Sequence, residues 1–144
     1  MKKIIKYTLL IIWMIIIFLF SNQPAKESGK LSNSFLEKTI TIFYKDINTE
    51  KKEQLIKKYG LITRKLAHFT IYLVLGVLML STISEYNIKT KILVSITLCF
   101  LYALSDEIHQ LFIIGRSGEF KDVLIDTAGS FIGINIYNII NKKK

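Results

Sequence analysis

The sequence predicts an all-α integral membrane protein with four transmembrane helices. Of its 144 residues, 51% are hydrophobic, and the mean hydropathy is +0.38. The apolar residues gather in four runs, each close to the roughly 20 residues that a helix needs to cross a bilayer. The chain has a single proline and only seven glycines, so few residues interrupt a helix. We expect one membrane domain over residues 1–144, because this length suits a single core.

The first apolar run covers residues 4–20 and follows the basic residues Lys2 and Lys3. It resembles a signal peptide, but no small-residue cleavage site follows it. We therefore interpret it as an uncleaved anchor. The other predicted transmembrane helices cover about residues 66–83, 92–114 and 123–140.

A long loop, residues 21–63, separates the first two predicted spans. Its apolar residues 31, 35, 36, 40 and 43 recur at roughly helical spacing. Asn48 or Thr49 is placed to cap a second short helix that ends before Gly60. We expect two amphipathic helices on the membrane surface. Solvated loop helices without a binding role are an equally good interpretation. The connections at 85–91 and 115–121 are short.

The net charge of +9 gives no indication of a nucleic-acid partner. In so apolar a chain it favours contact with anionic membrane lipids, and no nucleic-acid-binding motif accompanies it. The single cysteine, Cys99, excludes an internal disulfide and a cysteine-based zinc site. Because no recognised metal spacing such as His-Glu-x-x-His is present, we expect no metal and no cofactor.

The orientation follows from the first helix, which usually dominates membrane insertion. We expect both termini in the cytoplasm and the loop 21–63 outside. The many lysines of that loop argue the opposite way.

Polar residues gather at four helix ends that share one side of the membrane in any up-and-down chain. These are the C-terminal ends of the first and third spans and the N-terminal ends of the second and fourth. Helical spacing aims their side chains inward, because a charge that faces lipid costs a few kcal/mol. Gly129 and Gly133, four residues apart, favour close helix approach beneath them. The residues concerned are Gln23; Arg64, Lys65, His68 and Tyr72; Tyr102, Asp106, Glu107, His109 and Gln110; and Asp122 and Asp126.

Arginine is rare in this chain, which uses lysine for nearly every positive charge. Only Arg64 and Arg116 are arginines among 20 basic residues. A guanidinium makes two parallel hydrogen bonds to a carboxylate or phosphate, which an ammonium cannot do. The arginines therefore indicate either an anion-binding site or a structural network with the aspartates. The histidines fit a core role, metal ligation or acid–base chemistry.

Five collinear blocks resemble the VanZ family of bacterial membrane proteins. They are Phe20-Ser21-Asn22-Gln23-Pro24; Arg64-Lys65-x-x-His68-Phe69-x-x-Tyr72; Tyr102-Ala103-Leu104-Ser105-Asp106-Glu107-x-His109-Gln110-x-Phe112; Gly115-Arg116; and Asp122-Val123-x-x-Asp126-x-x-Gly129-x-x-x-Gly133. Asn22 stands where a serine is expected, and Ile114 where proline usually precedes Gly-Arg. The resemblance implies a multi-pass protein of the bacterial plasma membrane. The family's founding member is linked to low-level resistance to teicoplanin and related lipoglycopeptides.

Three functional classes remain open at this point. The first is a non-catalytic envelope protein that binds an anionic lipid head group, a lipid-linked cell-wall precursor or the antibiotic. Its ligand-binding residues would be Gln23, Arg64, Lys65, Tyr72, Gln110, Arg116, Asp122 and Asp126. The second is an outer-leaflet enzyme that modifies a lipid-linked precursor, with His68, Asp106, Glu107 and His109 as catalytic residues. The third, a proton-coupled carrier, is disfavoured because the polar residues lie on one side only. The sequence does not determine the oligomeric state.

Overall fold

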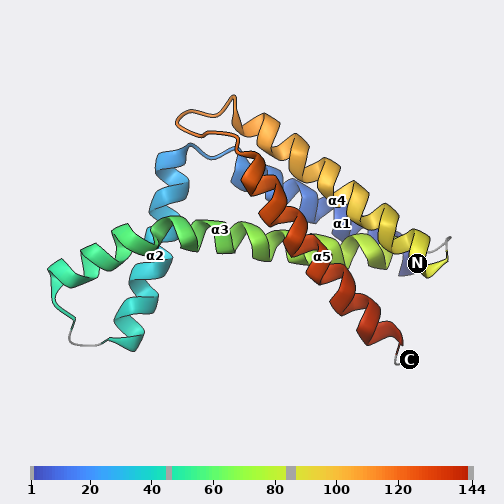
Figure 1. Cartoon of the computed structure of the whole chain (residues 1–144), viewed down its shortest axis with the longest axis horizontal. Helices are drawn as coiled ribbons and strands as arrows, with labels where there is room; N and C mark the ends of the chain where they lie inside the picture. The colour runs from blue at the N-terminus through green and yellow to red at the C-terminus, as the bar shows by residue number, and fades with distance from the viewer. Residues whose placement is uncertain (1, 45–46, 84–86, 143–144) are drawn as a thin grey trace.

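The chain folds into five α-helices in a computed structural model, which describes residues 2–44, 47–83 and 87–142 (Figure 1). No strand occurs within these ranges. Four helices are long and apolar enough to cross a membrane, as the sequence predicts, and the fifth is α2. The helices are α1 (Lys2–Ser21), α2 (Ala25–Phe43), α3 (Thr49–Thr82), α4 (Ile88–Gln110) and α5 (Phe120–Lys142).

The start of α1 lies beside the end of α3, so these two helices run antiparallel. Lys6 Nζ donates to Ser81 O at 3.0 Å, and Trp13 Nε1 donates to Ile71 O at 3.0 Å. Most large apolar side chains of α1 point away from the protein, among them Ile4 at 69% exposure. Since water would penalise such a surface, this face is suited to contact lipid.

Helices α3 and α5 cross in close backbone contact (Figure 1). A Cβ on Gly129 would collide with Phe69 O, and one on Gly133 would collide with Leu73 O. Gly76 of α3 lies in the same way against the backbone of α5. The predicted role of the glycine pair is therefore confirmed, because only a missing side chain lets the two backbones approach this closely.

The prediction of a short surface helix that ends before Gly60 is wrong. Helix α3 is continuous through this position, and at about 1.5 Å per residue its 34 residues extend about 51 Å. Gly60 has no left-handed backbone; the glycine with positive φ in the described chain is Gly115. A Cβ on Gly60 would instead lie 2.5 Å from the Asn33 side chain. The glycine serves the crossing of α2 over α3 rather than a helix end.

Asparagines cap two helices, and the first of these caps, at Asn48, was predicted from the sequence. Asn48 caps α3 by accepting a hydrogen bond from Glu50 N, and Asn87 caps α4 by accepting one from Thr90 N. The predicted turn at 85–91 is shorter than expected, because α4 begins at Ile88; residues 84–86 lie outside the described part.

The third span also ends earlier than the predicted residue 114. Helix α4 stops at Gln110, and a series of backbone turns continues the chain to Arg116. Gly115 adopts φ 76°, a conformation that suits glycine, within this segment. The early end frees the segment 111–119 to fold over the polar ends of the other helices.

Candidate functional site

The predicted meeting of four helix ends is present in the structure. The ends of α1 and α4 and the start of α5 lie at one end of the bundle, where α3 passes beside them (Figure 1). Four polar or charged side chains there are nearly inaccessible: Asp106, Glu107 and Gln110 are each 4% exposed, and Asp126 is 0% exposed. Groups of this kind are rarely buried unless they pair or bind something.

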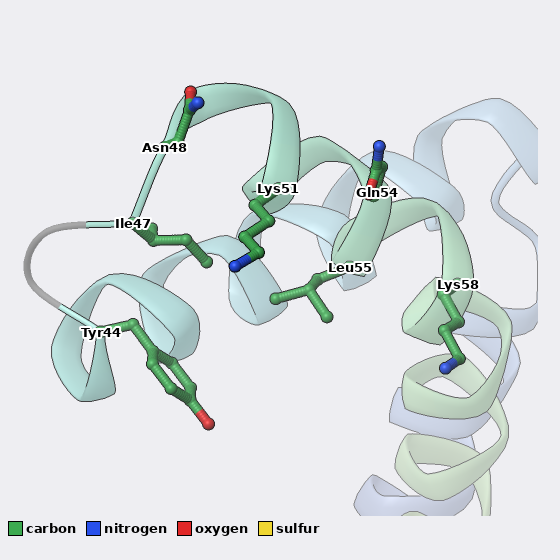
Figure 2. A pocket seen from close by; sticks show the side chains of 7 residues that line it. All are labelled: Tyr44, Ile47, Asn48, Lys51, Gln54, Leu55 and Lys58. Atoms are coloured by element: carbon green, nitrogen blue, oxygen red, sulfur yellow. The ribbon is translucent and has the colours of Figure 1, made fainter.

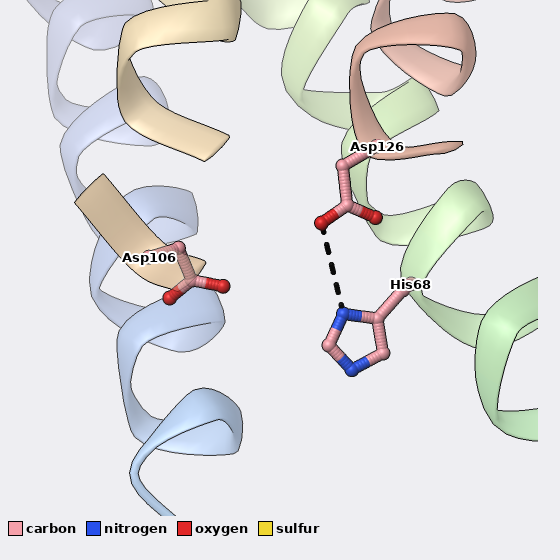
Figure 3. A group of neighbouring side chains, drawn as sticks. All are labelled: His68, Asp106 and Asp126. Carbon is pink, nitrogen blue, oxygen red and sulfur yellow. Dashed lines mark ion pairs between the residues drawn. The ribbon is translucent and has the colours of Figure 1, made fainter. Parts of the chain in front are cut away.

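His68, Asp106 and Asp126 form the inner part of this site. They come from α3, α4 and α5, and Figure 3 shows them as a triangle, with Asp126 above the His68 ring and Asp106 to the left of both. One ligand atom from each residue lies within 4.8 Å of the other two. His68 Nδ1 is 3.8 Å from Asp126 Oδ2, which is an ion-pair contact but too long for a hydrogen bond.

Further polar side chains surround Asp106. Gln110 Nε2 donates to Asp106 Oδ2 at 3.3 Å, and Tyr72 and Ser21 lie close enough to Asp106 to interact with it. Tyr72 is fully buried and tilts against Tyr102, with ring centroids 6.2 Å apart. Neither the Tyr72 hydroxyl nor the Ser21 hydroxyl completes a hydrogen bond. The inner site therefore contains buried polar atoms without partners.

Lys65 is already paired with acids. Its ammonium donates a short hydrogen bond to Asp122 Oδ1 and lies 3.8 Å from Glu119 Oε2. The sequence predicted Lys65 and Asp122 as ligand-binding residues. In the structure their charges compensate each other, and they join α3 to the start of α5.

Arg116 joins the segment 111–119 to the end of α1. Its Nε donates to Gln23 O at 2.9 Å, its Nη1 to Gln110 Oε1 at 2.9 Å, and its Nη2 to Phe20 O at 3.2 Å. Partial burial lowers the pKa of the Arg116 guanidinium below its usual value, and the positive charge of Arg64 acts in the same direction. An arginine nevertheless keeps its proton in proteins. All three nitrogen atoms of the guanidinium thus donate to acceptors within the chain.

Glu107 of α4 also holds the segment 111–119 in place. It accepts a hydrogen bond from Gln110 Nε2 at 2.9 Å and another from Glu119 N at 3.0 Å. Gly118 lies against Glu107 O and the Leu111 side chain, where a Cβ would collide. These contacts assign Glu107 to the support of the loop, whereas the sequence grouped it with the catalytic candidates.

His109 lies apart from the inner residues. Its Nε2 is 3.3 Å from Asn22 Oδ1, and its ring lies 4.8 Å from that of Phe18. The sequence placed His109 on one face with Asp106. The structure brings it to α1 instead, because successive positions of α4 point to different neighbours.

Arg64 faces two hollows. A narrow cleft of about 10 Å³ is lined by Arg64, Lys65, His68, Gln110, Asp122, Ile125 and Asp126. A larger groove of about 230 Å³ lies between α2 and α3 and is lined by Phe20, Gln23, Ser28, Leu31, Ser32, Phe35, Thr63, Arg64, Ala67, His68 and Ile71. Arg64 and His68 belong to both hollows and so connect the charged site with a mainly apolar groove.

A larger hollow lies elsewhere, between the end of α2 and the start of α3. It measures about 860 Å³ and is lined by Tyr44, Ile47, Asn48, Lys51, Gln54, Leu55 and Lys58 (Figure 2). Asn48 and Gln54 point away from Tyr44, and none of the lining residues is buried. Without convergent buried polar groups, this hollow is a weaker candidate site than the cluster of helix ends.

Three features of the site were missed from the sequence. Ser21 was part of a quoted motif but was not assigned a role, although its position at the end of α1 indicates the same side of the membrane. The groove depends on α2 crossing α3, and its apolar lining residues carry no signal that separates them from ordinary membrane-facing residues. Asn22, which contacts His109, was noted only as a departure from the family pattern.

The chain is similar to one described family. The family model VanZ/LLP1 matches residues 6–141, which is nearly the whole chain. Comparison with curated proteins and with solved structures gives no match. The matched range includes nearly all of the first predicted membrane span, the whole of the other three, and every residue of the site described above. The chain therefore belongs to the VanZ/LLP1 family.

Proposed function

We propose that this membrane protein binds an anionic amphiphile of the bacterial cell envelope, with its head group at Arg64 and its apolar part in the groove between α2 and α3. Ligands with this chemistry are a lipid-linked cell-wall precursor and a lipoglycopeptide. Binding of the second kind would connect the protein with teicoplanin resistance.

The unpaired guanidinium of Arg64 is the observation that carries this proposal. No hydrogen bond or ion pair joins Arg64 to any residue that the structure describes. The neighbouring Arg116 is also positive and adds to its charge, whereas Lys65 is already paired with Asp122. A phosphate or carboxylate placed here would receive two parallel hydrogen bonds from the guanidinium.

The groove supports an apolar partner for the same ligand. Phe20, Leu31 and Phe35 line it together with the apolar parts of α3, and Phe35 is 67% exposed. In a membrane such a groove is open to acyl chains. A head group at Arg64 and a chain along α2 would then be bound by one continuous surface.

The predicted orientation supports a ligand in the outer leaflet. The anchor argument places both termini in the cytoplasm, and α1 crosses the membrane once before Gln23 and Arg64. The groove then faces the outer side of the plasma membrane. This is the leaflet in which lipoglycopeptides and exported precursors are present.

A binding experiment in lipid nanodiscs tests the proposal. We expect thermal stabilisation and saturable binding with an undecaprenyl pyrophosphate lipid or with teicoplanin, and weaker binding with phosphatidylglycerol. Arg64→Gln should weaken binding by about tenfold or more, which corresponds to about 1.4 kcal/mol. Ala67→Phe should weaken it as well, because the added ring fills the groove while Arg64 remains.

Lys57→Gln is the matched control, since Lys57 is an exposed cation on the same helix outside the groove. It should bind like the wild type. The two ligand arms distinguish a precursor-binding protein from an antibiotic-binding one. Equal binding by the wild type and Arg64→Gln in every arm would refute the role of Arg64.

A second candidate function is acid–base catalysis on a lipid-linked precursor. Its support is the contact of 3.8 Å between His68 and Asp126, in a site that opens to the groove through His68. His68 would transfer the proton, with the aspartate orienting its ring. Turnover of a labelled precursor by the wild type, lost in His68→Gln but retained in His109→Gln, would favour this function over simple binding.

A further inference from the structure

Of the two buried carboxylates beside His68, Asp126 has no hydrogen-bond partner among the described residues, whereas Asp106 accepts a hydrogen bond from the Gln110 amide. Asp126 is 0% exposed, and neither of its side-chain oxygens makes a hydrogen bond. A buried ionised carboxylate without hydrogen bonds is strongly disfavoured, so buried groups of this kind normally pair or bind a cation. The second carboxylate, Asp106, lies in the same group and repels the first.

His68 does not donate the hydrogen bond to Asp126 that a buried ion pair normally includes. A charged hydrogen bond from an imidazolium has a length of about 2.7–2.9 Å, whereas His68 Nδ1 is 3.8 Å from Asp126 Oδ2. Figure 3 shows Asp106 to the left of the same ring, and the ion pair drawn from His68 goes to Asp126. The space between the three side chains is therefore not closed by a hydrogen bond between them.

The Tyr72 hydroxyl is an independent sign that this space takes a ligand. Tyr72 is 0% exposed, and its hydroxyl has no hydrogen-bond partner. It interacts electrostatically with both Asp106 and Asp126, so it points toward the same group of residues. Buried oxygen atoms from α3, α4 and α5 thus lie at one place beside His68, and those of Tyr72 and Asp126 have no hydrogen-bond partner among the described residues.

We propose that His68, Asp106 and Asp126 bind a divalent cation of the zinc or manganese class. One imidazole nitrogen and two carboxylate oxygens are common ligands for these ions, whereas magnesium and calcium prefer oxygen alone. The three ligand atoms already lie within 4.8 Å of one another. Ligands at about 2.1 Å from a zinc ion lie about 3.4 Å apart, so side-chain shifts of about 1 Å close the site.

The cleft above the three residues supplies the remaining coordination position. It is lined by His68 and Asp126 together with Arg64, and its volume of about 10 Å³ is about the smallest that can hold one water molecule. A cation bound by three protein ligands and one water has the arrangement of an open site. This proposal does not depend on the amphiphile groove, because the cation site lies among α3, α4 and α5.

The absence of a short metal motif is explained by this geometry. Each ligand comes from a different helix, and the three positions are separated by 38 and 20 residues in the sequence. No spacing of the His-Glu-x-x-His kind is produced by such a site. The sequence-based expectation of no metal rested on that spacing alone.

Zinc and manganese binding to the purified protein tests the proposal directly. The protein is purified in detergent with a tag free of histidine, treated with EDTA, and titrated with ZnCl₂ or MnCl₂ by calorimetry, with the melting temperature measured in parallel. We expect one site per chain and a higher melting temperature with the bound ion. The background is low, because the chain has two histidines and one cysteine, and Cys99 is buried.

Matched histidine variants assign the site. His68→Gln and Asp126→Asn should lower the affinity at least about tenfold, whereas His109→Gln should bind like the wild type. Unchanged affinity in His68→Gln, or no binding of either ion by the wild type, would overturn the proposal in favour of an internal salt-bridge group.

A second measurement covers the case in which a ligand variant fails to fold. In the wild type with ¹⁵N-labelled histidine, zinc should shift the imidazole resonances of one histidine and leave those of the other unchanged. His109→Gln identifies which signals belong to His68. A shift confined to His109 would refute the proposed ligand set without any variant of the site itself.

Discussion

Replacing Arg116 with lysine keeps the charge but removes the fork that ties the segment 111–119 to α1. The guanidinium donates to three acceptors, which are Gln23 O, Gln110 Oε1 and Phe20 O. A lysine has a single nitrogen and reaches one of them at a time. Arg116→Lys therefore loses two hydrogen bonds made by a charged donor.

The expected loss is worked from those two bonds. A hydrogen bond to a charged group contributes about 1.5–3 kcal/mol, and the lower value applies here because Arg116 is only half-buried. Water replaces part of what is lost, so we expect Arg116→Lys to reduce stability by about 2 kcal/mol. For a chain of this size, about 2–4 °C per kcal/mol gives a melting temperature lower by about 5 °C.

The assay is thermal unfolding of the purified protein in one detergent, with Lys121→Arg and Arg64→Lys as controls. Lys121 is exposed in the same part of the chain, and Arg64 makes no hydrogen bond within the described residues. Both controls should melt within about 1 °C of the wild type, although Arg64→Lys should lose ligand binding. If Arg116→Lys also melts within about 1 °C, the three hydrogen bonds do not hold the segment, and Arg116 returns to being a ligand candidate.

Three further predictions follow from other parts of the molecule. Gly133→Ala should destabilise the protein by at least about 1 kcal/mol or prevent its accumulation, because a Cβ there collides with the α3 backbone. Gly29→Ala has open space and should stabilise α2 by up to about 1 kcal/mol; both effects are measured by thermal unfolding. Tyr102→Phe removes the 2.7 Å hydrogen bond to the α1 backbone and should lower stability by about 1 kcal/mol in the same assay; no change would show that water replaces this bond. Lys45→Cys in a Cys99→Ser background should react with an impermeant thiol reagent in intact cells, and reaction only after permeabilisation would invert the topology; Lys45 lies outside the described residues.

The sequence supports the membrane assignment and the side on which the polar residues meet. Four apolar runs indicate four spans because lipid imposes length and composition on each helix separately. The meeting of Gln23, His68, Asp106 and Asp126 at one end follows from the alternation of direction along an up-and-down chain. The glycines at 129 and 133 could also be assigned, because a small residue every four positions marks a close helix contact.

The roles of individual charged residues needed the tertiary structure. Arg64 and Arg116 are indistinguishable by composition. Among the described residues, however, Arg64 has no hydrogen-bond or ion-pair partner, whereas Arg116 has three acceptors. Likewise, His68 joins two aspartates from other helices, while His109 turns to Asn22 of the chain after α1. The difference arises from helix rotation and from the path of the segment 111–119, which no local pattern encodes.

The sequence by itself thus determined the membrane character, the number of membrane spans and the common side of the polar residues. The first two depend on the hydropathy of each segment, and the third depends on the direction in which each segment runs. Tertiary structure alone decided that α3 runs unbroken through Gly60, because the reason is the approach of Asn33 from α2. It also decided that buried carboxylates from α4 and α5 meet beside one histidine of α3. Such contacts depend on how the helices rotate and cross, and the free energy that selects one arrangement is shared among residues far apart in the sequence.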